Sequence, residues 1–325
     1  MSKRNREGMA LLTVLLLVAA ISALAVLVLD DVRFSVRRTA NAEIGAQARW
    51  HALGGEALAS AIIARMNRAN PDRTPIEPAW VGQSRTFPID DGSITVTVSD
   101  GQACFNLNSV VEGYGEFLIG RETGRLQLIA LSRSIGIAAS RAEALADALT
   151  DWIDTDAVPE PQGAEDGAYQ AGLRPYRTGG TLLAEVSELR AVRGVDPGLY
   201  SALRPWVCAL PNPDLSTINV NTLTPAQAPL LVMLTQGRLN RPTAEALIAS
   251  RPGDGWPDIE AFRRQPVVTA LTSPSGLEQT TVRTRFFNIR VDVALAGAPV
   301  VRTALLEIDR QGAVRTVTRR WTIDE

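Results

Sequence analysis

The stretch GMALLTVLLLVAAISALAVLVL, residues 8–29, is a nearly unbroken apolar run that follows a short charged segment. Its 21 residues from Met9 to Leu29 include only two polar side chains, those of Thr13 and Ser22. A helix of about 20 apolar residues is long enough to cross the hydrocarbon core of a membrane. The run therefore predicts a membrane-spanning helix, and it decides how the rest of the chain is organised.

The charges on the two sides of this run predict its orientation. Lys3, Arg4 and Arg6 precede it, whereas Asp30 and Asp31 follow it. Because positively charged flanks stay in the cytoplasm, residues 1–8 are expected inside and the bulk of the chain outside. A secretory signal has a shorter apolar core that is followed by a small-residue cleavage site. Removal of the whole run is therefore not expected.

The helix is predicted to continue well beyond the membrane. Residues 32–66 contain no proline, and their apolar side chains recur mostly at intervals of four, as on one face of an amphipathic helix. Gly54–Gly55 is a weak point within this segment, and Asn70–Pro71 predicts its end. A continuous helix from Met9 to about Ala69 would be about 90 Å long.

The overall composition argues against several classes of protein. With 325 residues, 46% of them hydrophobic, the chain can bury a large core that is split over two domains. Its formal net charge of −2 predicts no general nucleic-acid-binding surface. The single histidine, His51, excludes the usual His-rich zinc sites. The sequence has no G-x-S-x-G, H-E-x-x-H, C-x-x-C or Walker motif, so no enzymatic activity is expected.

Strand-like segments lie on both sides of a helical region. Residues 93–108, SITVTVSDGQACFNLN, predict a hairpin that turns at Asp100–Gly101. Between about residues 109 and 277 the spacing is helical, for example in residues 140–156 and 181–192. We expect the two strand groups to complete one sheet around this helical insertion. The closing group consists of three predicted strands in residues 284–295, 299–310 and 313–323, with turns at 296–297 and 311–312.

The segment KRNREG at residues 3–8, followed by MALLTVLLLVAA, resembles the class III leader of type IV pilins and type II secretion pseudopilins. The resemblance implies that a prepilin peptidase cuts between Gly8 and Met9 and methylates the new N-terminus at Met9. Most family members carry Glu at the fifth mature position, where this chain has Thr13. The resemblance implies that this carboxylate meets the N-terminal amine of a neighbouring subunit, and a chain without it cannot make this pairing. A plain single-pass anchor is the alternative interpretation of this segment.

Further strings resemble the K-type minor pseudopilins of the type II secretion system, the general secretion pathway protein K family. They are FNLNSV at 105–110, TDWIDTDAVPEPQGAEDGAY at 150–169, INVNT at 218–222 and the closing strands. The resemblance implies an α+β fold: a pilin-like long N-terminal helix packed on an antiparallel sheet, with a large all-α insertion between strands that is SAM-like or helix-hairpin-helix-like. The expected segments are a cleaved leader (residues 1–8), the transmembrane part of the long helix (9–29), the first part of the head (30–108), the helical insertion (109–277) and the C-terminal strands of the head (278–325).

The same resemblance implies a function. K-type subunits also typically lack the acid at the fifth position, and the resemblance implies a place at the tip of the pseudopilus. The chain is therefore expected to help initiate or cap the filament for protein export across the outer membrane. Expected partners are the I- and J-type minor pseudopilins, the major pseudopilin and prepilin peptidase, with secreted substrates or the outer-membrane channel as further contacts and no nucleic acid. The expected location is the inner membrane, single-pass with a cytoplasmic N-terminus and a periplasmic bulk, before extraction into the pseudopilus.

An acidic loop is the best candidate for an ion site. Six carboxylates lie within the sixteen residues 151–166, and prolines and a glycine interrupt them. Hard cations such as Ca²⁺ take several oxygen ligands from a bent loop, although composition alone also suits a solvated acidic loop. Because K-type members bind calcium in the helical domain, the resemblance implies a Ca²⁺ site. The preferred ligands are Asp151, Asp154, Asp156, Glu165 and Asp166.

Cys104 and Cys208 are the only cysteines. In an oxidising compartment they could form one bridge that clamps the insertion to the sheet. Closing a loop of 104 residues would stabilise the fold by about 4–5 kcal/mol in the chain-entropy model. The alternative is two unrelated buried thiols.

Residues 218–264 resemble a helix-hairpin-helix or SAM-like module. In DNA-binding versions of this module, backbone N–H groups of a glycine-containing hairpin bind phosphate. Here the hairpin has a single glycine, Gly237, and the nearby charges are Arg238, Arg241 and Arg251. A membrane-anchored DNA receptor of the competence type is therefore the alternative function. An anchored hydrolase that uses the acidic loop is a third hypothesis without a supporting motif.

Overall fold

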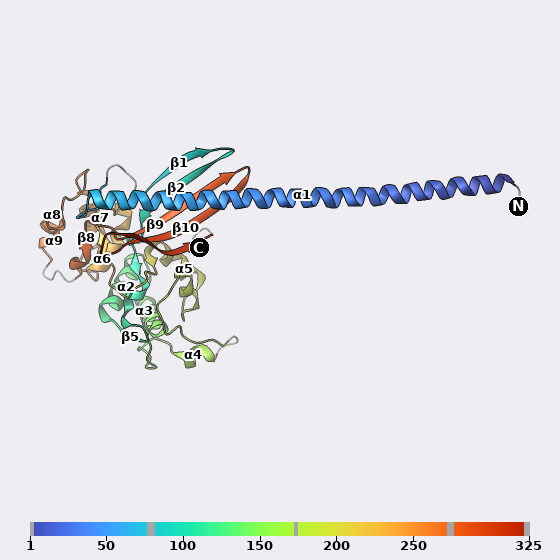
Figure 1. Cartoon of the computed structure of the whole chain (residues 1–325). Coiled ribbons are helices and arrows are strands. Elements are labelled where there is room, and N and C mark those ends of the chain that lie inside the picture. Colours follow the sequence, from blue (N-terminus) through green and yellow to red (C-terminus); the bar gives the residue numbers. More distant parts are fainter. Residues whose placement is uncertain (1–2, 77–81, 172–174, 272–275, 322–325) are drawn as a thin grey trace.

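The computed structural model describes residues 3–76, 82–171, 175–271 and 276–321. Its most prominent feature is one continuous helix, α1 (Lys3–Ala69), which projects far beyond the rest of the molecule (Figure 1). At 1.5 Å per residue this helix is about 100 Å long. Gly54–Gly55 does not interrupt it, and it ends just before Pro71. The predicted long N-terminal helix is confirmed.

A five-stranded antiparallel sheet lies against the C-terminal half of α1. The strand order is β1-β2-β9-β10-β11. Ala296 and Gly297 take positive φ values of 46° and 82° in the tight turn between β9 and β10, as predicted for this turn. The last three strands are those that the sequence predicted, although residues 322 and 323 lie outside the described residues. The strands are β1 (Gln83–Ile89), β2 (Gly92–Asp100), β9 (Phe286–Leu295), β10 (Ala298–Ile308) and β11 (Val314–Arg320).

The hairpin predicted within residues 93–108 is wrong. β2 pairs with β1 and β9, whereas Phe105–Asn106 forms β3, which pairs in parallel with β6 (Val207–Cys208). The chain does not fold back after β2, and Asp100 is held at the point where the chain leaves the sheet. Its Oδ2 accepts hydrogen bonds from the hydroxyls of Thr222 (2.6 Å) and Thr284 (2.9 Å). These contacts join the end of β2 to the segment that follows β7 and to the segment that leads into β9.

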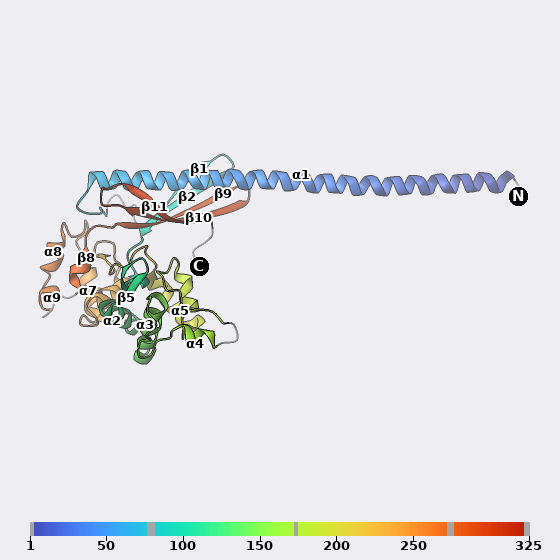
Figure 2. The ribbon, with the colours of Figure 1, turned by 60° about the horizontal axis from the view of Figure 1, so that its bottom comes forward.

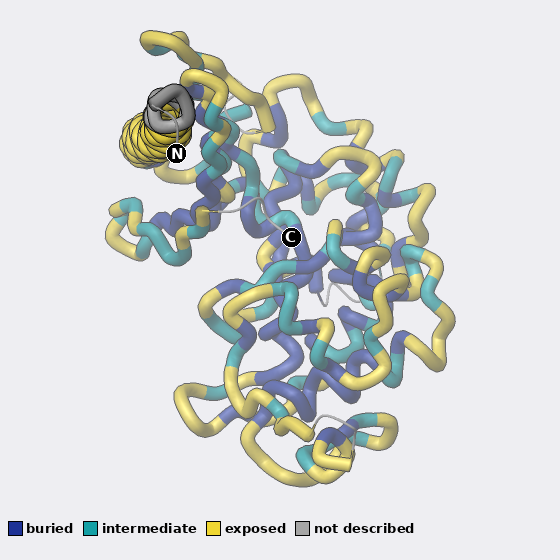
Figure 3. The backbone as a smooth tube through the Cα atoms, turned by 90° about the vertical axis from the view of Figure 1, so that its right-hand side faces the viewer, coloured by how far each residue is buried: buried dark blue, intermediate teal, exposed yellow. Residues whose placement is uncertain are grey.

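The molecule has three layers, with the sheet between α1 and the helical part (Figure 2). Gly55 allows α1 to approach β9 closely, since a Cβ at that position would lie 2.6 Å from Val291 Cγ1. Figure 3, which looks along α1, shows that the buried residues are concentrated in the head, whereas the projecting part of α1, seen end-on, is exposed. The core between α1 and the sheet includes Ala48, Ala52, Ala59, Ile63, Val96, Phe287, Ile289, Val291 and Leu306.

The helical part occupies the chain between β2 and β9 and has its own core, which includes Phe105, Leu131, Leu149, Trp152 and Phe262. The helix predicted in residues 181–192 is a 3₁₀ helix of six residues that begins only at Val186, where Glu185 and Glu188 form a reciprocal capping box. The elements are η1 (Leu107–Val110), β4 (Val111–Tyr114), β5 (Phe117–Gly120), α2 (Glu122–Ser134), α3 (Ala139–Ile153), α4 (Asp166–Gln170), η2 (Val186–Ala191), α5 (Pro197–Leu203), η3 (Arg204–Trp206), β7 (Ile218–Asn219), η4 (Pro225–Gln227), α6 (Ala228–Leu234), α7 (Arg241–Ala249), α8 (Ile259–Arg263), α9 (Pro266–Thr269), η5 (Leu277–Gln279) and β8 (Thr280–Thr281).

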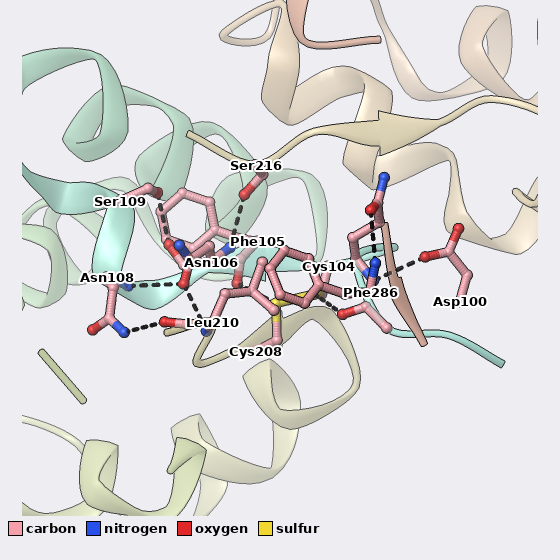
Figure 4. Close-up of a disulfide and its surroundings, with 12 residues drawn as sticks. Asp100, Cys104, Phe105, Asn106, Asn108, Ser109, Cys208, Leu210, Ser216 and Phe286 are labelled. Atoms are coloured by element: carbon pink, nitrogen blue, oxygen red, sulfur yellow. Dashed lines mark hydrogen bonds between the residues drawn. A yellow bond between two sulfur atoms is a disulfide. The ribbon is translucent and has the colours of Figure 1, made fainter. Parts of the chain in front are cut away.

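A disulfide joins Cys104 to Cys208, with a Cα–Cα distance of 5.8 Å (Figure 4). The disulfide was expected to clamp the insertion to the sheet, but both cysteines lie in the helical part. Cys104 directly precedes β3, and Cys208 lies in β6, the strand that pairs with β3. Cys208 nevertheless packs against Leu210, Phe286 and Leu305, where the helical part meets the sheet. The bridge therefore closes the helical part at the point where the chain enters it.

Candidate functional site: an acidic cluster and the outer face of the long helix

Three carboxylates converge where α3 ends and α4 begins. Asp154 terminates α3, and Glu165 is the residue that precedes α4. Asp154, Asp156 and Glu165 each offer one carboxylate oxygen, and these three atoms lie within 4.8 Å of one another. Asp154 is buried, Glu165 is half-buried and Asp156 is exposed. The cluster is therefore a partly buried concentration of negative charge.

Several buried oxygens of this region have no hydrogen-bond donor among the described residues, namely Asp154 Oδ1, Glu165 Oε1 and Asp151 Oδ2. Leaving such atoms unpaired is energetically costly. Burial, followed by the charges of Asp156 and Asp151, raises the pKa of Asp154 to about 7. Burial also raises the pKa of Glu165. An all-oxygen donor set with unpaired buried atoms fits a hard cation such as Ca²⁺.

The other two expected ligands are placed differently. Asp151 Oδ1 accepts a hydrogen bond from the Glu160 backbone N–H (3.0 Å). A Cβ at Gly163 would lie 1.9 Å from Asp151 Oδ2, so a larger residue there would displace this carboxylate. Asp166 turns away from the cluster, since its Oδ1 accepts hydrogen bonds from the N–H (2.9 Å) and the hydroxyl (3.0 Å) of Thr178. Asp151 thus holds the loop in shape, and Asp166 is tied to a different segment.

A second candidate site is the outer face of α1, which was not predictable from the sequence because the apolar periodicity of α1 marks the face that packs on the sheet. Trp50 is 74% exposed on this face, and Leu58 is also exposed. Ala46, Gly54 and Ala57 lie along the same exposed stripe. A large aromatic side chain among small residues suits close packing of another helix. Towards the N-terminus the apolar side chains from Leu12 to Leu29 are exposed as well, as expected for a membrane span.

The arginines considered for DNA binding are engaged inside the helical part. Arg241 forms an ion pair with Glu245 (2.8 Å), one turn further along α7. Arg251 donates to the backbone carbonyl of Leu223 (2.6 Å). Arg238 donates through Nε to the carbonyl of Thr235 in the same hairpin (3.0 Å). Each of the three arginines is thus engaged by a neighbouring group of the helical part.

Comparison with known proteins identifies the family. Two family models, both described as type II secretion system (T2SS), protein K, match residues 103–212 and 218–283. The type II secretion system protein K of Klebsiella pneumoniae is 35% identical over 330 residues, which cover 100% of both chains. That of Pectobacterium carotovorum subsp. carotovorum is 34% identical over 321 residues, 98% of this chain and 97% of the relative. This chain belongs to the type II secretion system protein K family.

The structural comparison agrees with this assignment. A crystal structure of the GspK-GspI-GspJ complex from the type 2 secretion system of enterotoxigenic Escherichia coli matches with a TM-score of 0.77 and 32% identity. The match covers 88% of this chain and 99% of that one. It confirms the predicted α+β fold with its long helix, antiparallel sheet and additional helices. The two protein K family models match the helical part, including the disulfide and the acidic cluster.

Membership of the protein K family also decides between the functional hypotheses. The family consists of minor pseudopilins, which are structural components of the secretion system rather than enzymes. The helical module in residues 218–264 lies within the second protein K match. The pseudopilin interpretation is therefore the one that accounts for the whole chain.

Proposed function

We propose that this chain is the terminal subunit of a type II secretion pseudopilus. The observation that carries the proposal is the shape of the molecule: the N-terminal half of α1 projects free of the head, whereas the sheet and the helical part are collected around its C-terminal half (Figure 1). A head of this width leaves little space for another subunit above it. Thr13 supports the same position, because a chain without the acid cannot hold the N-terminus of a further subunit.

The proposed partners are minor pseudopilins of the I and J types, which form a complex with the matching GspK chain, and the major pseudopilin below them. The outer face of α1 offers them a stripe of small residues around Trp50. Small residues allow helices to approach closely, and a buried indole contributes a large apolar area. We place this stripe in contact with the N-terminal helices of the partners.

Labelling of filaments tests this function. The chain, tagged at its C-terminus and produced with the other pseudopilins, is expected to be found at one end of each filament. Trp50→Ala is expected to reduce the fraction of labelled ends at least tenfold, because it removes the largest exposed apolar side chain of the stripe. Immunogold electron microscopy measures both the position and the fraction of label.

Tyr114→Ala is the matched control, since it removes an aromatic side chain that is even more exposed than Trp50 but lies in the helical part. This variant should label filament ends like the unaltered chain. Label spread along the filament shaft would contradict the terminal position. Unchanged end labelling by Trp50→Ala would contradict the role of the outer face.

We also propose that the mature chain begins at Met9, carries an N-methyl group there and is anchored by residues 9–29 in the inner membrane with its head in the periplasm. The apolar helix, its charged flanks and the family support this topology. Mass spectrometry of the chain produced together with prepilin peptidase is expected to show the loss of residues 1–8. A Gly8→Val variant should keep them. An intact leader in the unaltered chain would contradict processing at this site.

Finally, we propose that the acidic cluster holds a Ca²⁺ ion through Asp154, Asp156 and Glu165, with Asp151 shaping the loop. The support is the convergence of three carboxylates and the unpaired buried oxygens. Bound there, the ion would neutralise the repulsion among these groups and tie the end of α3 to the start of α4.

A further inference from the structure

The hairpin formed by β4 and β5 presents an apolar face to solvent. Tyr114 lies directly across from Phe117, and Glu112 lies across from Ile119. Because side chains alternate between the two faces of a strand, these four side chains share one face. Tyr114 is 90% exposed, Phe117 82% and Ile119 56%. The opposite face is anchored in the helical part by residues that include the buried Leu118.

The hairpin is held firmly by the neighbouring loop. The backbone N–H of Leu118 donates to the hydroxyl of Thr155 (3.1 Å), and the N–H of Thr155 donates to the carbonyl of Leu118 (3.0 Å). Val158, in the same loop, adds another apolar side chain that is 74% exposed. The exposed aromatic residues therefore stand on a preformed support, which lowers the entropic cost of binding a partner.

Acidic side chains accompany this apolar face. Glu116 is exposed in the turn of the hairpin. Glu160 Oε1 lies 3.4 Å from the position that a Cβ would take at Gly120, so this carboxylate flanks β5. Glu112 is paired with Arg121 (3.0 Å). The surface thus combines exposed aromatic residues with a net negative charge.

We propose that the outer face of the β4–β5 hairpin is a docking site for a polypeptide segment in which apolar side chains alternate with lysine or arginine. Aromatic residues dominate the binding energy of protein interfaces, and here they have no cover within the described chain. The acidic residues select a basic partner by charge complementarity. A second copy of this chain, or an anionic lipid surface, would bring like charges together.

The location of the hairpin suits a partner outside the filament. In Figures 1 and 2 the hairpin lies on the far side of the sheet from α1. Subunits that pack along α1 therefore leave it accessible. The inference relies on the proposed function only for this accessibility, and binding itself can be measured without any filament.

The test measures binding of a fluorescein-labelled eight-residue peptide that alternates Lys with Val and Phe. The full chain is held in phosphatidylcholine nanodiscs, and fluorescence anisotropy reports the dissociation constant. We expect the basic peptide to bind and the same peptide with Glu in place of Lys not to bind. The double variant Tyr114→Ser/Phe117→Ser should bind at least tenfold more weakly, which corresponds to about 1.4 kcal/mol.

Two further variants separate the apolar and charged contributions. Tyr114→Phe keeps the aromatic ring and should bind like the unaltered chain. Glu116→Lys reverses one exposed charge, so it should weaken binding and flatten its dependence on salt. Both positions are exposed, and an unchanged melting temperature will show that the head is intact.

Three results would overturn the proposal: no binding of the basic peptide, equal binding of the acidic peptide, or unchanged binding by the double variant. Vesicles that contain phosphatidylglycerol provide the last arm. Co-sedimentation of the nanodisc-held chain with these vesicles, if it were lost in the double variant, would assign the hairpin to a membrane surface and would also overturn the proposal. None of these outcomes bears on where the chain sits in the filament.

Discussion

Replacing Glu56 by alanine is expected to lower the free energy of unfolding of the head by about 3–5 kcal/mol. Glu56 is buried between α1 and the sheet, where its Oε2 lies 2.5 Å from Nε of Arg302. Its Oε1 lies 2.8 Å from Nε of Arg319. Arg302 is itself buried, with the ring of Trp321 stacked 4.2 Å from its guanidinium carbon. Without Glu56 this guanidinium would remain buried and lose its charged partner.

Arg319→Ala is the matched control, because its side chain is 57% exposed. Pairs of this kind contribute at most about 1 kcal/mol, so this variant should be nearly as stable as the unaltered chain. Urea denaturation of the detergent-solubilised chain, followed by circular dichroism, measures both changes. A loss of less than about 1 kcal/mol in Glu56→Ala would show that the pair does not hold α1 on the sheet.

The same pair predicts how stability depends on pH. Burial alone raises the pKa of Glu56, but the hydrogen bonds and charges of Arg319 and Arg302 outweigh it and hold the pKa below its ordinary value. A carboxyl group whose pKa is lower in the folded state stabilises the fold above its unfolded pKa. This contribution should be lost as the pH falls through the folded value, and it should be absent from Glu56→Ala.

Adding Ca²⁺ is expected to stabilise the unaltered chain and to have little effect on Asp154→Asn. At a free Ca²⁺ concentration 100 times the dissociation constant, linkage predicts a gain of about 2.7 kcal/mol. Without Ca²⁺ the Asp154→Asn variant should be at least as stable as the unaltered chain, because it removes one of several repelling carboxylates. Thermal unfolding in EDTA and in Ca²⁺ distinguishes these effects.

Asp166→Asn is the control for this experiment, since Asp166 is bonded to Thr178 and lies outside the converging group. It should keep the response to Ca²⁺. Because protonation of Asp154, with its pKa of about 7, competes with the ion, apparent Ca²⁺ affinity should fall as the pH drops below 7. Equal loss of the response in both variants, or a normal response in Asp154→Asn, would contradict the proposed ligand set.

The sequence predicted the elements whose signals are local. The apolar run of residues 9–29 and the proline-free segment after it specify α1, because helix formation depends on neighbours three and four residues apart. Alternating side chains and tight turns likewise predict β9, β10 and β11. The acidic loop was predictable by composition. Its resemblance to the K-type family pointed to Ca²⁺, which remains a proposal.

Contacts between distant segments were not predictable in this way. β1 contains Pro88 and mostly polar, exposed residues, and β2 finds its other partner, β9, about 190 residues further along the chain. Within the acidic loop, composition could not show that Asp154, Asp156 and Glu165 converge while Asp166 turns to Thr178. These outcomes depend on how the ends of α3 and α4 are oriented.

The sequence by itself therefore determined a long helix with a membrane-spanning first half, a sheet of closing strands and a helical insertion. Only the tertiary structure decided that Glu56 pairs with Arg302 across 246 residues and that Trp50 remains uncovered. It also decided that Tyr114 and Phe117 stand exposed on one face of a hairpin. Local patterns encode the backbone periodicity of each element, whereas burial and pairing arise only when separate elements pack together.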